Sequence, residues 1–454
     1  MKLANLSSFY KRLYLQLLFI CSYIVFMQVF KESEQGFAKL FTALDRRAIA
    51  NESVVDTVAD VIAQVKAKGD AALIDYTARF DGVTLTADDL WVSEEEKQAA
   101  LDSLSEQSKA AFAATLENIQ IFAKHSLKQD WQTHNAQGAV IGERFYPYDR
   151  VGVYVPGGKA PLVSSALMTA GFAQAAGVKE IIAATPVQKD GKVNPALLAA
   201  LVYCGVNKVL KVGGAQAIAA LALGTDQVQP VEKIVGPGNV YVVEAKRQLV
   251  GAVSIDMLPG PSEILVLADD SANPAYIAAD LLAQAEHGPD SDIVFITDSE
   301  NLLESVQQAI KEQLKTLSRA EIIDKVLQTK TKVFLVEQLS SAVDLVNAYA
   351  PEHLSLAVAN QDNYIGQIRT AGAIFVGDMS PVAVGDFVAG PSHTLPTGGA
   401  GKSFSGLRAD QFQRRISVVQ LDKESLSKSL EFVEEFARIE GLDAHGQSAS
   451  IRLQ

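Results

Sequence analysis

The sequence has few cysteines, few histidines and no excess of positive charge, and these shortages exclude several classes of protein. Two cysteines among 454 residues cannot form a disulfide framework or a cysteine-based zinc site, so a reducing compartment fits. A formal net charge of -13 excludes the basic surface that nucleic acid phosphates require. Hydrophobic residues make up 48% of the chain and charged residues 20%, which is typical of a globular enzyme. We therefore expect a folded protein of more than one domain that binds no nucleic acid.

A hydrophobic leader opens the chain. Residues 13–30 are strongly apolar and follow Lys2, Lys11 and Arg12, as in a signal peptide or a signal anchor. The run is short for a membrane span, and no small-residue cleavage site follows it. Met27 offers a second start for translation, which would make residues 1–26 an upstream extension outside the fold. These interpretations stay open, and we expect a cytoplasmic protein without membrane contact unless the leader is a real anchor or export signal.

Hydrophobic periodicity divides the remaining chain. Residues 27–150 are predicted to be mainly helical, because apolar side chains recur at helical spacing over 54–65 and 101–122. From residue 151 onward, short apolar runs alternate with helical stretches, a pattern typical of parallel sheets covered by helices on both faces. The expected strands are 150–155, 180–184, 208–212, 233–235, 263–268, 292–297, 332–336 and 373–376.

The predicted fold class is therefore α/β, with two Rossmann-like parallel-sheet domains wrapped by helices. The first domain would span 151–255 and the second 256–385. A C-terminal segment, 386–454, contains another amphipathic helix and would complete the site.

Three glycine-rich turns fall where an expected strand gives way to a helix: Pro156-Gly157-Gly158, Gly213-Gly214 and Gly236-Pro237-Gly238. Glycine lets backbone amides approach a phosphate or ribose closely, and open α/β sheets bind ligands at the carboxyl ends of their strands. The same glycines could simply end the strands, and no G-x-G-x-x-G fingerprint is present. The turns alone do not decide between these two interpretations.

Four of the six histidines lie beyond residue 284, each among other polar residues. Gln284 and His287 are three residues apart near the end of an expected helix, so both side chains project from one face and could share a metal ion. Two more ligands are needed, and Asp386 and His445 are candidates. Nitrogen and oxygen ligands suit zinc, manganese or cobalt. Helix capping would explain the same Gln/His pair.

Glu352 and His353 form a different kind of pair. Adjacent residues in a loop after a helix can both face a pocket, where they would supply a carboxylate and an imidazole for proton transfer. A solvent-facing glutamate beside a histidine that caps a helix is the simpler alternative.

Eight blocks of sequence, in a specific order and spacing, carry a family resemblance. They are Val151–Gly158, Val212–Leu221, Gly236–Asn239, Gly260–Glu263, Asp280–Asp290, Pro351–Leu354, Gly385–Asp386 and His393–Thr397. Together they resemble the histidinol dehydrogenase family, from about residue 27 to the C-terminus. The resemblance implies a zinc enzyme that oxidises L-histidinol through L-histidinaldehyde to L-histidine, with reduction of two NAD+, in the last steps of histidine biosynthesis.

The resemblance also implies a role for individual residues. His353 would accept the hydroxyl proton as hydride leaves for the nicotinamide, and Glu352 would activate water on the aldehyde. One zinc ion per subunit would be held by Gln284, His287, Asp386 and His445. The substrate-contacting residues would be Ser262, Gln284, His287, His353, Asp386, His393, Glu440 and His445, and the NAD-contacting residues Tyr154, Gln216 and Asn239. The family is homodimeric with shared active sites, so His445 would act on the partner's site.

Two features depart from the family pattern. Ser392 stands where asparagine is common, and the leader has no counterpart. A same-fold NAD-dependent dehydrogenase of another small polar alcohol, such as a sulfopropanediol, is the alternative enzyme, although Glu440 and Ser262 favour an amino-alcohol. A non-catalytic protein that binds a metal or a small molecule is the alternative from another class.

Overall fold

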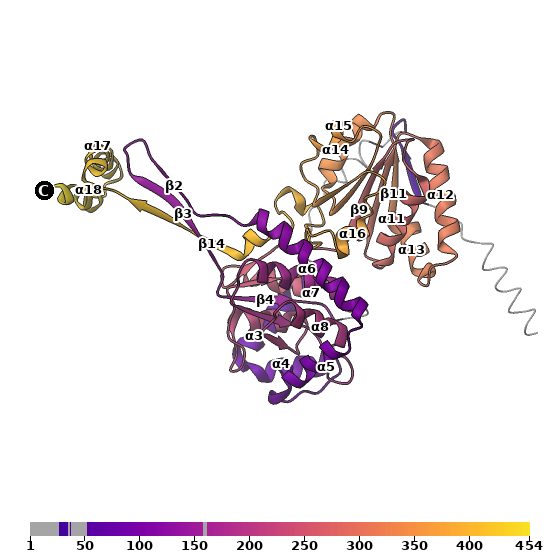
Figure 1. The fold of residues 1–454 in the computed structure, drawn as a ribbon, viewed down its shortest axis with the longest axis horizontal. Coiled ribbons are helices and arrows are strands. Elements are labelled where there is room, and N and C mark those ends of the chain that lie inside the picture. Colours follow the sequence, from indigo (N-terminus) through magenta and orange to yellow (C-terminus); the bar gives the residue numbers. More distant parts are fainter. Residues whose placement is uncertain (1–26, 35–36, 38–51, 158–160) are drawn as a thin grey trace, which may run out of the picture.

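The computed structural model describes residues 27–34, 37, 52–157 and 161–454 (Figure 1). The leader, residues 1–26, and Gly158 of the first glycine turn lie outside these ranges. Met27 is buried in the core beneath a parallel sheet. Within the described ranges, no helix is both long enough and apolar enough to cross a membrane.

The first α/β unit is built on a five-stranded parallel sheet with the order β6-β5-β4-β7-β8. Its strands are β4 (Arg150–Tyr154), β5 (Glu180–Ala184), β6 (Lys208–Leu210), β7 (Lys233–Val235) and β8 (Ser254–Ile255). Most of these residues are buried, because helices cover both faces of the sheet. Neither face is exposed to solvent, so the strands do not alternate between apolar and polar residues.

In the described part of the chain, eight helices cover the two faces of this sheet. One face packs against α5 (Glu94–Asp102), α6 (Glu106–Ser126), α7 (Val163–Ala175) and α8 (Pro195–Tyr203). The other face packs against α3 (Glu52–Lys68), α4 (Asp70–Phe80), α9 (Gly214–Leu223) and α10 (Val240–Leu249). The predicted helices of the N-terminal segment therefore serve as outer layers of the first sheet.

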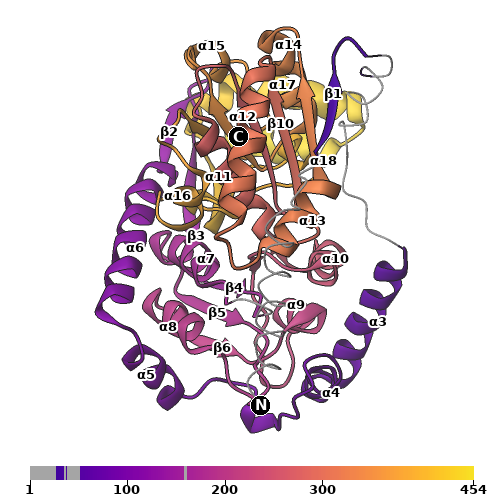
Figure 2. The same cartoon turned by 90° about the vertical axis from the view of Figure 1, so that its right-hand side faces the viewer.

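The second α/β unit is a six-stranded parallel sheet with the order β1-β11-β10-β9-β12-β13. Its strands are β1 (Gln28–Lys31), β9 (Glu263–Ala268), β10 (Asp292–Thr297), β11 (Thr331–Leu335), β12 (His353–Ala357) and β13 (Ala373–Val376). Its helices are α11 (Pro274–Glu286), α12 (Glu300–Leu314), α13 (Ala320–Lys330), α14 (Leu339–Tyr349), α15 (Asp362–Ile365) and α16 (Val382–Phe387). Figure 2 shows this sheet above the five-stranded one.

Two strands of the second sheet differ from the sequence-based expectation. β1 comes from the stretch predicted to be mainly helical and pairs in parallel with β11. β12 begins at His353, which was expected to lie in a loop, and pairs with β9 and β13. The α/β fold class with two parallel sheets is confirmed.

A three-stranded antiparallel ribbon extends from the body of the molecule (Figure 1). It consists of β2 (Trp131–His134), β3 (Val140–Pro147) and β14 (Gln413–Gln420). At its far end lie α17 (Lys423–Glu440) and α18 (Asp443–Ser450), which we call the tail. Asp422 caps α17 by accepting a hydrogen bond from the Ser425 N–H, and Gly441 ends it at φ 68°. The ribbon therefore holds the tail away from both parallel sheets.

Candidate active site

Seven of the predicted site residues gather at one edge of the six-stranded sheet. Ser262 directly precedes β9 and His353 begins β12. The helix α11 runs back from β9 toward the start of β10, so its end lies at the same edge. The seven residues are Ser262, Gln284, His287, Glu352, His353, Asp386 and His393. This edge carries the amino ends of the strands, opposite to the carboxyl ends at which open α/β sheets usually bind ligands.

His353 is buried, with 3% of its surface exposed, and each ring nitrogen has a distinct environment. Its Nδ1 lies 3.1 Å from the backbone oxygen of Glu263. A carbonyl oxygen only accepts hydrogen bonds, so Nδ1 carries the proton and Nε2 keeps its lone pair. Burial lowers the pKa of His353, which favours the neutral ring. His353 also lines a cavity of about 460 Å³, so it is suited to accept a proton there.

Glu352 is buried beside it, with 6% of its surface exposed. Its Oε2 accepts hydrogen bonds from the Ser262 hydroxyl and from the Glu263 N–H, both at 2.8 Å. These bonds favour the carboxylate, but loss of hydration outweighs them and raises the pKa of Glu352 to about 8. The carboxyl group can therefore gain or lose a proton near neutral pH.

Three of the predicted metal ligands lie together. The Gln284 amide nitrogen donates to the Ser262 hydroxyl at 3.1 Å, which leaves the amide oxygen as a ligand atom. His287 follows the last residue of α11, and the Asp386 carboxylate is close enough to interact electrostatically with the His287 ring. One Asp386 oxygen lies 3.7 Å from His353 Nε2. An amide oxygen, an imidazole and a carboxylate fit zinc. Within the described ranges, no three His, Cys, Asp or Glu side chains form a complete metal-binding group.

His393 contacts both α/β units. Its Nδ1 lies 2.8 Å from the Asp386 backbone oxygen, and its Nε2 lies 3.0 Å from the hydroxyl of Ser165. Ser165 is in the first turn of α7, which follows the carboxyl end of β4. The carboxyl edge of the five-stranded sheet therefore meets the amino edge of the six-stranded sheet at this point. Sequence reasoning missed Ser165, because a serine inside an apolar helix carries no signal of its own.

The three predicted NAD-contacting residues lie at the carboxyl edge of the five-stranded sheet. Tyr154 ends β4, and its hydroxyl accepts a hydrogen bond from the Gly214 N–H at 3.0 Å. Burial raises the pKa of Tyr154 to about 12, so the hydroxyl keeps its proton. Gln216 is 1% exposed, and its Oε1 is buried with no hydrogen-bond partner among the described residues. Such an acceptor requires a donor, which a bound dinucleotide could supply.

Asn239 occupies the third position of this group, at the start of α10. Its side-chain oxygen accepts hydrogen bonds from the N–H groups of Tyr241 and Val242. The side-chain oxygen of Asn239 is therefore occupied by capping the helix, and the exposed amide nitrogen remains available as a hydrogen-bond donor.

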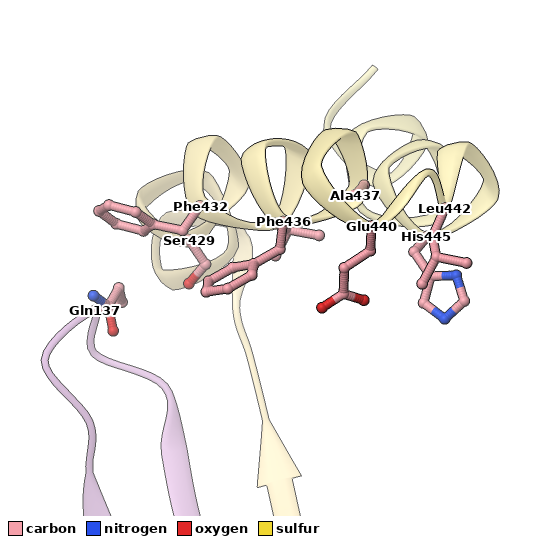
Figure 3. Close-up of a pocket in the computed structure, with 9 residues that line it drawn as sticks. Gln137, Ser429, Phe432, Phe436, Ala437, Glu440, Leu442 and His445 are labelled. Carbon is pink, nitrogen blue, oxygen red and sulfur yellow. The ribbon is translucent and has the colours of Figure 1, made fainter.

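Glu440 and His445 are separated from the other site residues of the same chain. They lie on the tail and line a groove of about 450 Å³ with Phe432, Phe436 and Leu442. Figure 3 shows the side chains of Phe436, Glu440 and His445 projecting from the same side of the tail. The tail itself lies at the far end of the ribbon, well away from the six-stranded sheet (Figure 1).

Comparison with known proteins identifies the family. Residues 44–453 match the family model for histidinol dehydrogenase. The histidinol dehydrogenase of Syntrophotalea carbinolica is 44% identical over 425 residues, which are 94% of this chain and 98% of that protein. The chain belongs to the histidinol dehydrogenase family. The histidinol dehydrogenase of Bacillus subtilis is 43% identical, over 87% of this chain and 92% of that protein.

The solved structures agree with the sequence comparison. The crystal structure of histidinol dehydrogenase from Elizabethkingia anophelis matches with a TM-score of 0.89 at 36% identity, covering 94% of this chain and 98% of that one. The predicted family and the prediction of an oxidoreductase are therefore confirmed. A dehydrogenase of another polar alcohol and a non-catalytic binding protein are not favoured.

Proposed function

We propose that this protein oxidises L-histidinol through L-histidinaldehyde to L-histidine in the cytoplasm, with reduction of two NAD+. The observation that carries the proposal is the buried Glu352–His353 pair beside the ligand atoms of Gln284, His287 and Asp386. A general base and a water-activating carboxylate are the two groups that successive oxidations of an alcohol and an aldehyde need. Family membership supports this substrate over other small alcohols.

Zinc and NAD each have a fitting set of residues. Gln284, His287 and Asp386, with His445 of the partner subunit, would hold one zinc ion per subunit. Bound zinc would hold and orient the amino and imidazole nitrogens of the substrate, and NAD+ would accept the hydride. The buried, unpartnered oxygen of Gln216 supports a dinucleotide at the carboxyl edge of the five-stranded sheet, beside Tyr154 and Asn239.

His353 acts in the first oxidation. An alcohol has a pKa far above neutrality, so a positioned base must take its proton as hydride leaves the carbon. The Nε2 lone pair of His353 does this at the cavity, and the bond from Nδ1 to the Glu263 oxygen stabilises the imidazolium that results. The product of this step is the aldehyde and a protonated His353.

Glu352 acts in the second oxidation. Its carboxylate accepts a proton from a water molecule as that water adds to the aldehyde carbon. The resulting hydrate anion loses a hydride, which the second NAD+ would accept, and becomes the carboxylic acid. Ser262 and the Glu263 N–H orient the Glu352 carboxyl group throughout. Ser262, His393 and Glu440 would also contact the substrate, and a closed site keeps the reactive aldehyde from escaping.

The active form would be a homodimer in which each tail completes the partner's site. Within one chain, His445 and Glu440 lie apart from the other site residues. The tail also exposes a row of large apolar side chains, of which Phe436 and Ile439 are each 64% exposed. A large exposed apolar surface favours association with another chain.

Turnover of L-histidinol tests the proposal directly. Zinc-loaded protein with excess NAD+ should form two NADH per L-histidinol, with L-histidine as the product. A sulfopropanediol serves as the control substrate and should give a much lower rate. If L-histidinol gives no NADH while the control alcohol does, the proposed substrate is wrong.

A further inference from the structure

A fully buried ion pair lies behind the proposed NAD site. Lys246 on α10 and Asp256, just after β8, have no exposed side-chain surface, and Lys246 Nζ lies 2.7 Å from Asp256 Oδ1. Removing two charges from water is costly, and apolar residues of similar volume often stabilise a core equally well. The pair therefore needs an explanation beyond stability, and its hydrogen bonds provide one.

The ion pair holds both backbone polar groups of a single residue, Gly236, and therefore the peptide units on either side of it. Lys246 Nζ donates to the Gly236 carbonyl oxygen at 2.5 Å, and the Gly236 N–H donates to Asp256 Oδ2 at 2.8 Å. Asp256 Oδ1 also accepts a hydrogen bond from the Met257 N–H at 2.7 Å. Each member of the pair thus fixes one side of Gly236.

Gly236 requires such fixing because its backbone is unusual. Its φ is +114°, which L side chains rarely adopt, and a Cβ there would lie 2.1 Å from the Tyr154 backbone oxygen. Gly236 therefore packs directly on the backbone of one predicted NAD-contacting residue. Three residues later, Asn239 is another such residue and caps the helix that carries Lys246.

The second glycine turn, Gly213-Gly214, joins the same arrangement. The Tyr154 hydroxyl accepts the hydrogen bond from the Gly214 N–H, and Gln216 lies in the first turn of the helix that begins there. Lys246 and Asp256 thus lie behind Gly236, Tyr154 packs against it, and Gly214 binds Tyr154. A shift of Gly236 would move the surface formed by all three predicted NAD-contacting residues.

We propose that Lys246 and Asp256 are positioning residues that fix the turn Gly236–Asn239 for NAD binding. This inference rests on the proposed NAD site. Neither side chain reaches solvent, and their charges cancel, so they act through hydrogen-bond geometry and not by attracting phosphates. Lys233 lies near both groups, and its ammonium donates to the Ile255 oxygen at 2.9 Å. Loosening Gly236 should weaken NAD binding and leave the chemistry at the six-stranded sheet intact.

Two double variants separate hydrogen bonding from charge. Lys246→Gln/Asp256→Asn removes both charges but keeps a donor for the Gly236 oxygen and an acceptor for its N–H. Lys246→Met/Asp256→Leu removes the charges and the hydrogen bonds together. Zinc-loaded enzyme should show a KM for NAD raised about tenfold in the Met/Leu variant and within about twofold of wild type in the Gln/Asn variant. The KM for L-histidinol and kcat at saturating NAD should stay within about twofold in both.

Two single variants serve as controls. Leu198→Ala, in the core beneath the opposite face of the same sheet, should lower the Tm without changing the KM for NAD, so it reports on destabilisation alone. Gln216→Ala tests the proposed NAD site itself and should raise the KM for NAD.

The outcomes are distinguishable. An unchanged KM for NAD in Gln216→Ala overturns the proposed NAD site. A raised KM in Gln216→Ala with an unchanged KM in the folded Met/Leu variant overturns the positioning role of Lys246 and Asp256. Equal loss in the Met/Leu and Gln/Asn variants also overturns it, because charge would then be decisive. If the Met/Leu variant does not fold, the single variants Lys246→Met and Lys246→Gln allow the same comparison of KM for NAD.

Discussion

Mixing two inactive variants tests whether the tail serves the partner's site. His353→Asn removes the proposed base from the body of the molecule, and His445→Asn removes the proposed zinc ligand from the tail. In a single chain these residues lie far apart, because the ribbon holds the tail away from the six-stranded sheet. Each variant alone should be nearly inactive at stoichiometric zinc.

The expected recovery follows from the geometry. In a heterodimer, one site combines the intact body of one chain with the intact tail of the other, and the second site carries both substitutions. Equal amounts of the two chains, reassorted at random, give about half heterodimers, so about a quarter of all sites are intact. If each tail served its own chain, every site would carry one substitution and no activity would return.

The assay needs chains that exchange freely. The two variants, with different affinity tags, are co-expressed or refolded together, and NADH formation from L-histidinol is compared with that of wild type. Activity of about a quarter of the wild-type value supports exchange of tails between subunits. Activity equal to the mean of the two parents, in material shown to contain heterodimers, refutes it.

Three further predictions concern the base, the carboxyl group and the tail. His353→Asn should lower kcat by about 10²–10⁴-fold with bound zinc unchanged, and loss of zinc on metal analysis would contradict the assigned role. Because burial raises the pKa of Glu352 to about 8, it is protonated below that pH, so oxidation of histidinaldehyde should accelerate as the pH rises toward 8 and then level off. A flat pH–rate profile would argue against Glu352 as the base. Phe436 is 64% exposed in the single chain, so Phe436→Asp should change the free energy of unfolding of the monomer by less than about 0.5 kcal/mol but weaken dimerisation in sedimentation experiments. Phe80→Asp, at a similarly exposed phenylalanine on α4, is the matched control and should leave dimerisation unchanged.

The buried parallel strands were predictable and the pairings between distant segments were not. Glu263–Ala268 and Asp292–Thr297 form near-continuous apolar runs because helices cover both faces of their sheet. The strand that begins at His353 was missed because its first residue is polar, and that residue is buried at the candidate site. The ribbon pairs Val140–Pro147 with Gln413–Gln420, and half-exposed strands so far apart in sequence leave no local signal.

The candidate site was predicted from resemblance more than from spacing. The helical spacing of Gln284 and His287 correctly indicates one helix end, but it does not indicate that Asp386 lies beside them. The turns around Tyr154 and Gly236 lie at the carboxyl ends of strands, which is where open α/β sheets usually bind ligands, and the proposed NAD site agrees with this rule. It does not describe the edge at which His353 begins its strand, because there the helix ends supply the polar groups. No local pattern distinguishes the tail position of His445 from a position in the body.

The edge strand Gln28–Lys31 has a consequence for synthesis of the chain. Among the residues that the structure describes, its one pairing segment is Lys332–Leu335, which is made about 300 residues later. At about 5–20 residues per second, the ribosome needs roughly 15–60 s to produce that partner. During this interval a strand with apolar residues at its centre, Val29 and Phe30, has unpaired N–H and C=O groups and is open to mispairing or to chaperones. The strands of the five-stranded sheet lie between these two segments in the sequence, so they are all synthesised before Gln28–Lys31 can pair. The six-stranded sheet therefore cannot be completed until late in translation.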